Sequence, residues 1–304
     1  MAEQQETPTS ETPISDQGDL RRTAHHMMPR SSRATSAGQS RGNAAPMEKP
    51  HDREFVNAVA RALAILHSFD GAEAVLGNHQ IAARTGLAKS TIARLTHTLL
   101  RTGHLARVRH GDGYRLGIGT LTFASTALRG LELRRVIRGC LAEIAALVSG
   151  TIGLAARDGL EMVYLDYARA AHVLSLHSTI GSRVPLAETA AGRAWIIAQP
   201  QAEQENLLAS LTERDAAAGR ALSAWLDDYR DAFARDGYVI SCGAWNPYVN
   251  GVGVPVFFPA YGATMVLVAG VLAAEYDRDR LDREVAPLLR DLATRLAGLE
   301  DQTK

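Results

Sequence analysis

"GLAKSTIARLTHTLLRTGHL", residues 86–105, decides how the first part of this chain folds. Within it, Ile92, Leu95 and Leu99 recur at the i, i+3 and i+7 spacing of one helix face, and Leu100 lies beside them. The stretch contains no acidic residue. It therefore predicts a helix that packs by its apolar face and presents the following residues to solvent: Lys89, Ser90, Thr91, Arg94, His97, Thr98 and Arg101.

Two shorter predicted helices precede this one. Residues 55–69, "FVNAVARALAILHSF", repeat apolar residues at helical spacing. The next helix runs from about Asn78, a good N-cap residue, to Thr85. It stops at Gly86, which readily takes the left-handed conformation that a tight exit requires. We expect the apolar face of the third helix to pack on Val59, Leu63, Leu66 and Ile81.

A β-hairpin is predicted directly after the third helix, which ends at Gly103. In "GHLARVRHGDGYRLG" the residues Leu105, Arg107 and Arg109 alternate, a Gly-Asp-Gly turn follows, and a short return strand closes the hairpin. Three helices followed by a hairpin form a winged helix-turn-helix, which we assign to residues 55–118.

The charge of this region differs from that of the whole chain, whose formal net charge is +0. The overall balance argues against a generally basic nucleic-acid coat protein. The acidic residues between positions 55 and 117 are Asp70, Glu73 and Asp112, whereas the basic ones are Arg61, Arg84, Lys89, Arg94, Arg101, Arg107, Arg109 and Arg115. This local excess predicts double-stranded DNA as the partner, contacted by the polar face of the third helix and by Arg107, Arg109 and Arg115 on the hairpin.

Two further segments flank the predicted DNA-binding region. Residues 1–54 are rich in Ser, Thr, Pro, Gln and Arg and lack a helical or strand period, so we expect a disordered, solvated tail. The start of the chain has no apolar stretch typical of a secretory signal, which favours a cytoplasmic protein. Residues 119–148 show a Leu- and Ala-rich helical pattern and are predicted to form a linker helix that also packs against a partner chain.

Cysteines and candidate metal ligands give little sign of further chemistry. Cys140 and Cys242 are far apart in the sequence, and neither belongs to a Cys-X-X-Cys or Cys/His motif. We expect two ordinary, partly buried thiols in a reducing compartment. No cofactor and no metal site are predicted.

Residues 149–304 are predicted to form a second, mixed α/β domain. The candidate strands are Ile152 to Ala156, Met162 to Tyr167, Val173 to His177, Val252 to Phe258 and Thr264 to Leu272. The candidate helices are Thr189 to Ala198, Gln201 to Leu211, Ala221 to Asp236 and Arg278 to Leu299. This order favours an antiparallel or mixed sheet over a repeating βαβ array. Residues 251–274 carry no charge and are long enough to span a bilayer, but Pro255 and Pro259 interrupt them, so we expect a hairpin of buried strands and no membrane partner.

Two sets of motifs resemble one known family. "RALAIL", "IAARTGLAKSTIARLTHTLLRTGHL" and "YRLG" resemble the N-terminal domain of IclR-type bacterial transcriptional regulators, and "GSRVPLAETAAGRA", "DGYVIS" and "GVGVPVF" resemble their C-terminal effector domain. The resemblance covers nearly everything after the tail. It implies a winged helix-turn-helix, a helical linker and a GAF-like α/β domain with a curved, mainly antiparallel sheet, in an α+β fold.

The resemblance also implies a function. Members of this family repress or activate neighbouring genes, often for the catabolism of small or aromatic acids, and bind palindromic operators as homodimers or homotetramers. The expected partners are therefore operator DNA, a small-molecule effector and a second copy of the chain, and RNA polymerase is a further partner that this family allows.

In the family, the effector lies beside the segment that matches residues 181–192 and two late strands. The backbone N–H groups at a helix start can bind a carboxylate, and Arg183 either pairs with an acid or makes a structural ion pair. The effector-binding residues predicted in this way are Gly181, Arg183, Val184, Leu186, Thr189, Ala190, Ala191, Gly192, Ser241, Gly251, Gly253 and Leu267.

Several positions depart from the family pattern, which commonly has polar or charged residues there. The replacements in this chain are Ala187, Arg193, Ser241, Gly243, Ala244, Gly251 and Leu267. A pocket without those polar groups is more apolar and favours an aromatic or hydrophobic acid. Trp195, Trp245, Tyr248 and Phe257 either line it or pack in the core. A decayed site that binds no small molecule is the alternative.

Two other functions remain open at this point. One is an enzyme fused to a DNA-binding domain, with Cys242 as nucleophile and His172 or His177 as base. The residues around Cys242 do not form a nucleophile elbow. The other is an adaptor that uses the winged helix to hold a protein. The sequence favours a regulator without catalytic residues over both.

Overall fold

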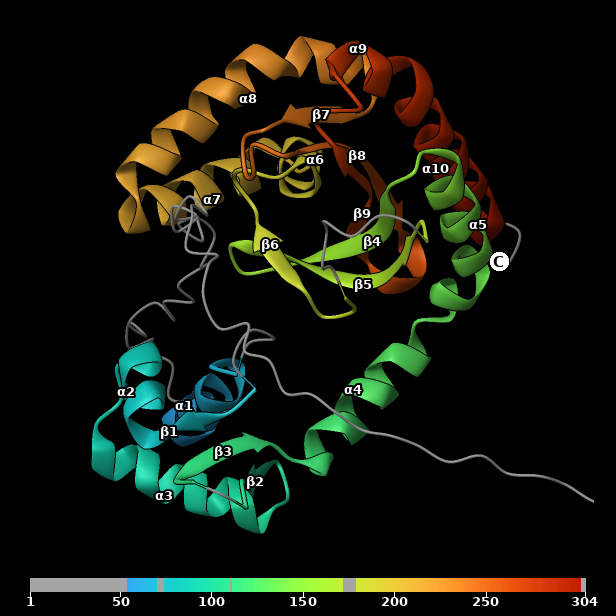
Figure 1. Cartoon of the computed structure of the whole chain (residues 1–304). Helices are drawn as coiled ribbons and strands as arrows, with labels where there is room; N and C mark the ends of the chain where they lie inside the picture. Colours follow the sequence, from blue (N-terminus) through green and yellow to red (C-terminus); the bar gives the residue numbers. More distant parts are fainter. Residues whose placement is uncertain (1–53, 70–73, 110, 172–178, 302–304) are drawn as a thin grey trace, which may run out of the picture. The chain divides into compact units, whose positions relative to one another are not determined.

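The computed structural model describes residues 54–69, 74–109, 111–171 and 179–301 (Figure 1). Its first module consists of three helices and a three-stranded antiparallel sheet of order β1-β3-β2. These elements are α1 (Asn57–His67), β1 (Leu76–Gly77), α2 (Asn78–Thr85), α3 (Lys89–Arg101), β2 (Leu105–Arg107) and β3 (Gly113–Leu116). This is the expected winged helix-turn-helix.

The turn between α2 and α3 forms as the sequence predicts. Gly86 has a φ angle of 68°, in the left-handed region, and its N–H donates to the carbonyl of Ala82. The start of α2 differs by one residue, because the N-cap is Gly77 and not Asn78. The Gln80 side chain reaches back and accepts the Gly77 N–H at 2.8 Å, so the helix start is satisfied without an Asn cap.

The core of the first module corrects one expectation about α1. Ile65 is fully buried, whereas Val59 and Leu63 are 57% and 49% exposed. The cause is that "ALAIL" is apolar on more than one side, so spacing does not tell which side turns inward. Ile65 is joined in this core by Leu76, Ile81, Ile92, Leu99, Leu105 and Tyr114.

The hairpin pairs Leu105 with Leu116 and Arg107 with Tyr114. The sequence did not predict β1, which pairs Leu76 with Tyr114 on the other side of β3. A two-residue strand is too short to show alternation, so no periodicity signals it.

The linker is two helices, not one. α4 (Ile118–Gly130) and α5 (Glu132–Leu147) are separated at Leu131, whose φ of −90° and ψ of 78° are not helical. α4 has no buried residue. α5 buries the apolar face formed by Ile137, Leu141, Ile144 and Ala145 against the sheet of the second module. The helical period continues through the break, which explains why the sequence predicts one helix.

The second module contains a curled six-stranded sheet of order β6-β5-β4-β9-β8-β7, in which every pair is antiparallel (Figure 1). Its strands are β4 (Thr151–Asp158), β5 (Glu161–Arg169), β6 (Arg183–Pro185), β7 (Val239–Cys242), β8 (Val249–Phe258) and β9 (Ala263–Leu272). The sequence missed β6 and β7, which are short edge strands. The predicted strand at residues 173–177 lies outside the described residues.

Helices cover both faces of this sheet. α5 and α10 (Ala286–Asp301) pack on one face, and α6 (Ala190–Ile197), α7 (Gln201–Arg214) and α8 (Ala216–Asp236) lie on the other. The predicted C-terminal helix is a succession of α9 (Arg278–Arg280), a π-helical turn (Leu281–Val285) and α10. α8 begins five residues before its predicted start, because Asp215 accepts the N–H groups of Ala217 and Ala218 and caps it there.

A β-bulge in β5 turns neighbouring side chains to opposite faces of the sheet. Tyr164 pairs with Ala155 and Asp166 pairs with Leu154, so Leu165 is the extra residue. Tyr164 packs with the α6 side of the sheet. The buried Asp166 carboxylate accepts a hydrogen bond from Arg134 Nε on α5 at 3.1 Å.

The uncharged residues 251–274 form the β8–β9 hairpin, with a 3₁₀ turn at Pro259–Tyr261 and Gly262 at φ 56°. Buried strands at the middle of the sheet explain why so long a stretch has no charge. Among the described residues, no helix has the length and apolar character needed to cross a bilayer.

Candidate functional site

The outer face of α3 is a row of exposed polar side chains. Lys89, Ser90, Arg94, His97, Thr98 and Arg101 are exposed and Thr91 is half-buried. The inner face holds Ile92 and Leu99 in the core. It also buries Thr96, whose hydroxyl donates to the Ile92 carbonyl at 2.8 Å and so needs no outside partner. Sequence spacing had not assigned Thr96 to this face.

The N-terminus of α3 is open. Its N-cap residue, Ala88, has no side chain that can accept a hydrogen bond from the first turn. The first N–H groups of a helix carry partial positive charge and bind phosphate where nothing else caps them. Lys89 follows at the first helical position and adds a full positive charge. This end of α3 is therefore suited to a DNA phosphate.

The hairpin adds a second basic surface. Arg107, Arg109 and Arg115 are exposed, and the Arg107 guanidinium lies over the Tyr114 ring at 5.9 Å. That contact holds the arginine stem against the hairpin. In the described sequence from the start of α3 to the end of the hairpin, Asp112 at the turn is the one acidic residue beside these basic side chains.

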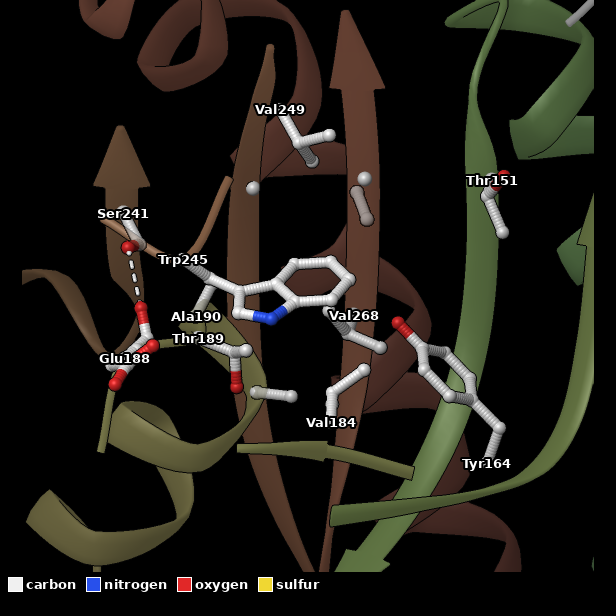
Figure 2. Close-up of a pocket in the computed structure, with 14 residues that line it drawn as sticks. Thr151, Tyr164, Val184, Glu188, Thr189, Ala190, Ser241, Trp245, Val249 and Val268 are labelled. Atoms are coloured by element: carbon white, nitrogen blue, oxygen red, sulfur yellow. Dashed lines mark hydrogen bonds between the residues drawn. The ribbon is translucent and has the colours of Figure 1, made fainter. Parts of the chain in front are cut away.

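A cavity lies in the second module between the start of α6 and the sheet (Figure 2). Its volume is about 50 Å³, which holds a few water molecules. Most of the lining is apolar or backbone. The lining residues are Thr151, Tyr164, Val184, Glu188, Thr189, Ala190, Ala191, Ser241, Trp245, Val249, Gly251, Val268, Ala269 and Gly270.

The polar groups of the cavity lie at the first turn of α6. Thr189 caps this helix by accepting the Gly192 N–H at 3.1 Å. Ala190 and Ala191 are buried, and within the described residues neither of their N–H groups has an acceptor. Buried backbone donors are almost always paired, so this pair is suited to an anionic ligand. Thr151 contributes a buried hydroxyl that also lacks a partner among the described residues.

Glycines let α6 approach the sheet closely. A Cβ atom on Gly251 would lie 2.9 Å from the Ala269 carbonyl oxygen and 3.3 Å from the Ala190 Cβ. A Cβ on Gly253 would overlap the Ala190 carbonyl, and one on Gly192 would overlap the Leu186 backbone. These close contacts hold the N–H groups of α6 beside the cavity.

The structure brings half of the predicted effector residues together around this cavity. They are Val184, Thr189, Ala190, Ala191, Ser241 and Gly251. The others lie outside its lining: Gly181, Arg183, Leu186, Gly192, Gly253 and Leu267.

Each residue outside the lining has a structural reason for its place. Gly192, on α6 itself, lets the helix lie against the Leu186 backbone, and Gly253, on β8, lets the sheet lie against α6. Leu186 belongs to the core on the α6 side, and Leu267 points through the sheet to the core on the α5 side, because strand alternation puts Val268 and not Leu267 at the cavity. Gly181, at φ 85°, supplies a turn.

Arg183 is engaged elsewhere. Its guanidinium binds the carboxylates of Glu161 at 2.5 Å and Asp158 at 2.8 Å. Burial works against its charge, but these hydrogen bonds raise the pKa of Arg183. The structural ion pair, one of the two roles considered for this residue, is therefore the one present.

Sequence reasoning missed several lining residues: Thr151, Tyr164, Glu188, Val249, Val268, Ala269 and Gly270. Strand alternation gave a usable signal for Val268, but the others follow from how α6 sits on the sheet. Among the four candidate aromatics, Trp245 lines the cavity. Trp195 is buried and donates its Nε1–H to the Thr264 carbonyl, while Tyr248 and Phe257 are exposed.

The rim of the cavity at residues 187–189 is held by side chains. Arg193 Nε donates to the Ala187 carbonyl at 2.9 Å, and Ser241 Oγ donates to the Glu188 carbonyl at 3.2 Å. Arg193 also stacks over Trp225 at 5.0 Å. Burial lowers the pKa of Arg193, and the Glu188 carboxylate opposes this effect. The Arg193 guanidinium and the Glu188 carboxylate thus place opposite charges near the rim of a mostly apolar cavity.

The features of a catalytic thiol are missing from Cys242. The residue as a whole is exposed, contrary to the expected partial burial, but the thiol is partly desolvated, and this raises its pKa. A nucleophilic cysteine needs a lowered pKa. The histidines considered as its base, His172 and His177, lie outside the described residues. The described part of the chain also contains no cluster of residues that could hold a metal ion.

Two family profiles match this chain. Residues 58–109 match the IclR helix-turn-helix domain, and residues 125–297 match the profile described as bacterial transcriptional regulator IclR C-terminal. The two matches correspond to the two modules and follow the same order along the chain.

Individual relatives agree. The crystal structure of an IclR family transcriptional regulator from Brucella abortus is 34% identical, with a TM-score of 0.74, and the match covers 82% of this chain and 94% of that one. The HTH-type transcriptional regulator TsaQ1/TsaQ2 of Comamonas testosteroni is 28% identical over 202 residues, 66% of this chain and 72% of that protein.

A third relative shares the fold. It is an IclR homolog from Microbacterium hydrocarbonoxydans, solved in complex with 4-hydroxybenzoate, with 22% identity, a TM-score of 0.59 and coverage of 79% of this chain and 98% of that one. Since the C-terminal profile alone covers more than half of the sequence, this chain belongs to the IclR family of DNA-binding transcriptional regulators and is not an enzyme.

Proposed function

We propose that this regulator binds a palindromic operator beside a catabolic operon and that a small aromatic or hydrophobic organic acid, bound in the cavity, controls the binding. The DNA contacts are assigned to the outer face of α3 and to the hairpin. The residues concerned are Lys89, Ser90, Thr91, Arg94, His97, Thr98, Arg101, Arg107, Arg109 and Arg115.

The observation that carries the effector proposal is the pair of unpartnered, buried N–H groups of Ala190 and Ala191. A carboxylate there gains two hydrogen bonds and the favourable end of the α6 dipole. The rest of the ligand then lies against Val184, Val249 and Val268, which offer it no charge. A protein of the same fold was solved with 4-hydroxybenzoate, an acid of this class.

Exposed apolar side chains support a homodimer or homotetramer. α4 exposes Ile118 at 77%, Leu121 at 57% and Phe123 at 66%. α1 and its N-cap expose Val56, Val59 and Leu63. Leaving such side chains in water is unfavourable, and we infer that a second copy of the chain covers them. Two copies then present two α3 helices to the two halves of a palindrome.

The effector proposal is tested with the full-length chain and a panel of carboxylic acids. Benzoate, 4-hydroxybenzoate and phenylacetate are each added at millimolar concentration while the melting temperature is recorded. Selective binding to the folded chain raises the melting temperature, and the neutral amide of each acid serves as its control. If no acid in the panel raises it, the alternative of a regulator with a decayed effector site takes the place of this proposal.

The DNA proposal is tested with labelled fragments from upstream of this gene and its neighbours. Anisotropy titrations between 50 and 200 mM salt are expected to give an affinity that falls steeply, because each neutralised phosphate releases counterions. A flat response favours the adaptor reading. Reporter expression with and without the regulator decides between repression and activation, and loss of activation on removing surface residues of the bound regulator would point to RNA polymerase. A chromosomal partner implies a cytoplasmic location.

A further inference from the structure

The cavity is too small for the ligand that the proposed function requires. Its volume is about 50 Å³, whereas sites that enclose a small molecule usually measure about 300 Å³ or more. A ring with a carboxylate therefore enters only if one wall moves aside. The walls differ in how firmly they are held, and this difference identifies the wall that moves.

Most of the walls are fixed. Val184 and Val268 belong to paired strands. Gly251 leaves no slack between the sheet and α6, since an added Cβ would lie 3.3 Å from the Ala190 Cβ. The rim before α6 is held by hydrogen bonds, and one of them joins Thr189 Oγ1 to the Pro185 carbonyl at 2.7 Å. Moving any of these elements breaks strand pairing, closes a tight contact or breaks the hydrogen bond of the helix cap.

Trp245 is held differently. It lies in the loop between β7 and β8, whose backbone is fixed: the Gly243 N–H donates to the Val249 carbonyl and the Val249 N–H to the Asn246 carbonyl. The Trp245 indole itself makes no hydrogen bond or ring contact within the described residues, and it is 42% exposed. It can therefore change rotamer without disturbing the loop that carries it.

The Trp245 indole also faces the space that a bound ligand would occupy. Figure 2 shows the Trp245 indole in the middle of the cavity lining, above Thr189 and Ala190, with the ring of Tyr164 to its right. A flat ring that enters beside the indole meets Val184 and Val268 on its other side. Aromatic rings stacked in this way gain attraction beyond that of the area they bury. A puckered ring of equal size does not make this contact.

We propose that Trp245 is the specificity-determining residue of the cavity: it is the movable wall that turns aside to admit a ligand and then stacks on it, so that the site selects acids with a flat aromatic ring. This inference rests on the proposed function, which supplies the acid. It adds the residue that distinguishes aromatic from saturated acids.

The test compares two acids of nearly equal size and charge, benzoate and cyclohexanecarboxylate. Calorimetric titration of the full-length chain is expected to give about a tenfold preference for benzoate, the size of one aromatic contact. Trp245→Leu is expected to reduce this preference to about twofold or less by weakening benzoate, and Trp245→Phe to retain most of it. The control is Phe257→Leu, which removes an exposed aromatic side chain outside the cavity lining and is expected to leave the preference unchanged.

A second readout follows the indole directly. Benzoate is expected to change the tryptophan fluorescence of the native chain and of Trp225→Phe, but not that of Trp245→Phe. Because Trp245 is partly exposed, the two Trp245 variants are expected to keep the native melting temperature without ligand.

The outcomes distinguish a failure of the role of Trp245 from a failure of the proposed effector function. If Trp245→Leu keeps the tenfold preference, or if the native chain prefers the saturated acid, the role of Trp245 is overturned while acid binding stands. If the native chain binds neither these acids nor any other in the panel, the proposed effector function fails, and this inference fails with it.

Discussion

Side chains form the outer face of α3, whereas backbone groups supply the hydrogen-bond donors of the cavity beside α6. On α3 the side chains form the surface, and Lys89, Arg94 and Arg101 are exposed there at helical spacing. At the cavity the backbone supplies the donors, and Ala190 and Gly251 are present because they are small. A surface made of side chains changes with each substitution, whereas a site made of backbone depends on how closely its elements pack.

The largest expected effect comes from removing charge on α3. The double variant Lys89→Ala, Arg94→Ala is expected to weaken operator binding by about a hundredfold or more, since each base or phosphate contact contributes roughly 1–3 kcal/mol. Anisotropy titration measures the loss. Arg295→Ala, which removes an exposed arginine on α10, is the control and is expected to bind DNA normally. Native affinity in the double variant would remove α3 from the DNA interface.

The matching change at the cavity acts through packing. Gly253→Ala places a methyl group against the Ala190 carbonyl and Ala194, so α6 must shift, and we expect a loss of roughly 1–3 kcal/mol of stability. Acid binding should weaken with it, because the N–H groups of α6 move. Thermal unfolding and calorimetry measure the two effects. Gly298→Ala, where a Cβ meets nothing within 4 Å, serves as control. An unchanged melting temperature in Gly253→Ala would contradict the close packing.

A substitution at the open end of α3 separates stability from DNA binding. Ala88→Asp supplies the missing cap and is expected to stabilise the chain by roughly 0.5–2 kcal/mol, while its charge repels the phosphate and weakens operator binding about tenfold. Ala88→Ser caps without charge and is expected to give a comparable gain in stability with a smaller loss of affinity. Equal DNA binding by Ala88→Asp and the native chain would exclude a phosphate at this end.

The smallest effect concerns charge at the cavity edge. Glu188 lines the cavity. Its carboxylate repels a bound carboxylate, but the repulsion is weak because Glu188 is exposed and solvent screens its charge. Glu188→Gln is expected to strengthen binding of benzoate about two- to fivefold, with no change for benzamide. Calorimetry with both ligands measures the difference. Weaker benzoate binding in the variant would mean that the acid group lies elsewhere.

Sequence reasoning succeeded where a single element carries its own signal. The apolar row of α3, the glycine at position 86 and the alternating wing each depend on neighbours along the chain, and all three appear in the structure. The uncharged hairpin was predicted for the same reason, because two prolines and a turn interrupt it.

The remaining features depend on contacts between distant residues. Which side of α1 turns inward is decided by α2 and α3, and so Ile65 was missed. The break at Leu131 arises because α5 packs on the sheet while α4 buries none of its residues there or elsewhere. At the cavity, Thr151, Glu188 and Trp245 come from three separate segments that only the curled sheet brings together.

The bulge at Leu165 directs the two side chains that flank it to opposite faces of the sheet. One of them, Tyr164, lines the cavity. The other, Asp166, holds Arg134, which follows the Leu131 break and whose Nη1 lies 3.5 Å from the Leu128 carbonyl in the last turn of α4. Without the extra residue both side chains would point to the same face of the sheet. The bulge therefore connects the lining of the cavity, through Asp166 and Arg134, to the joint between α4 and α5.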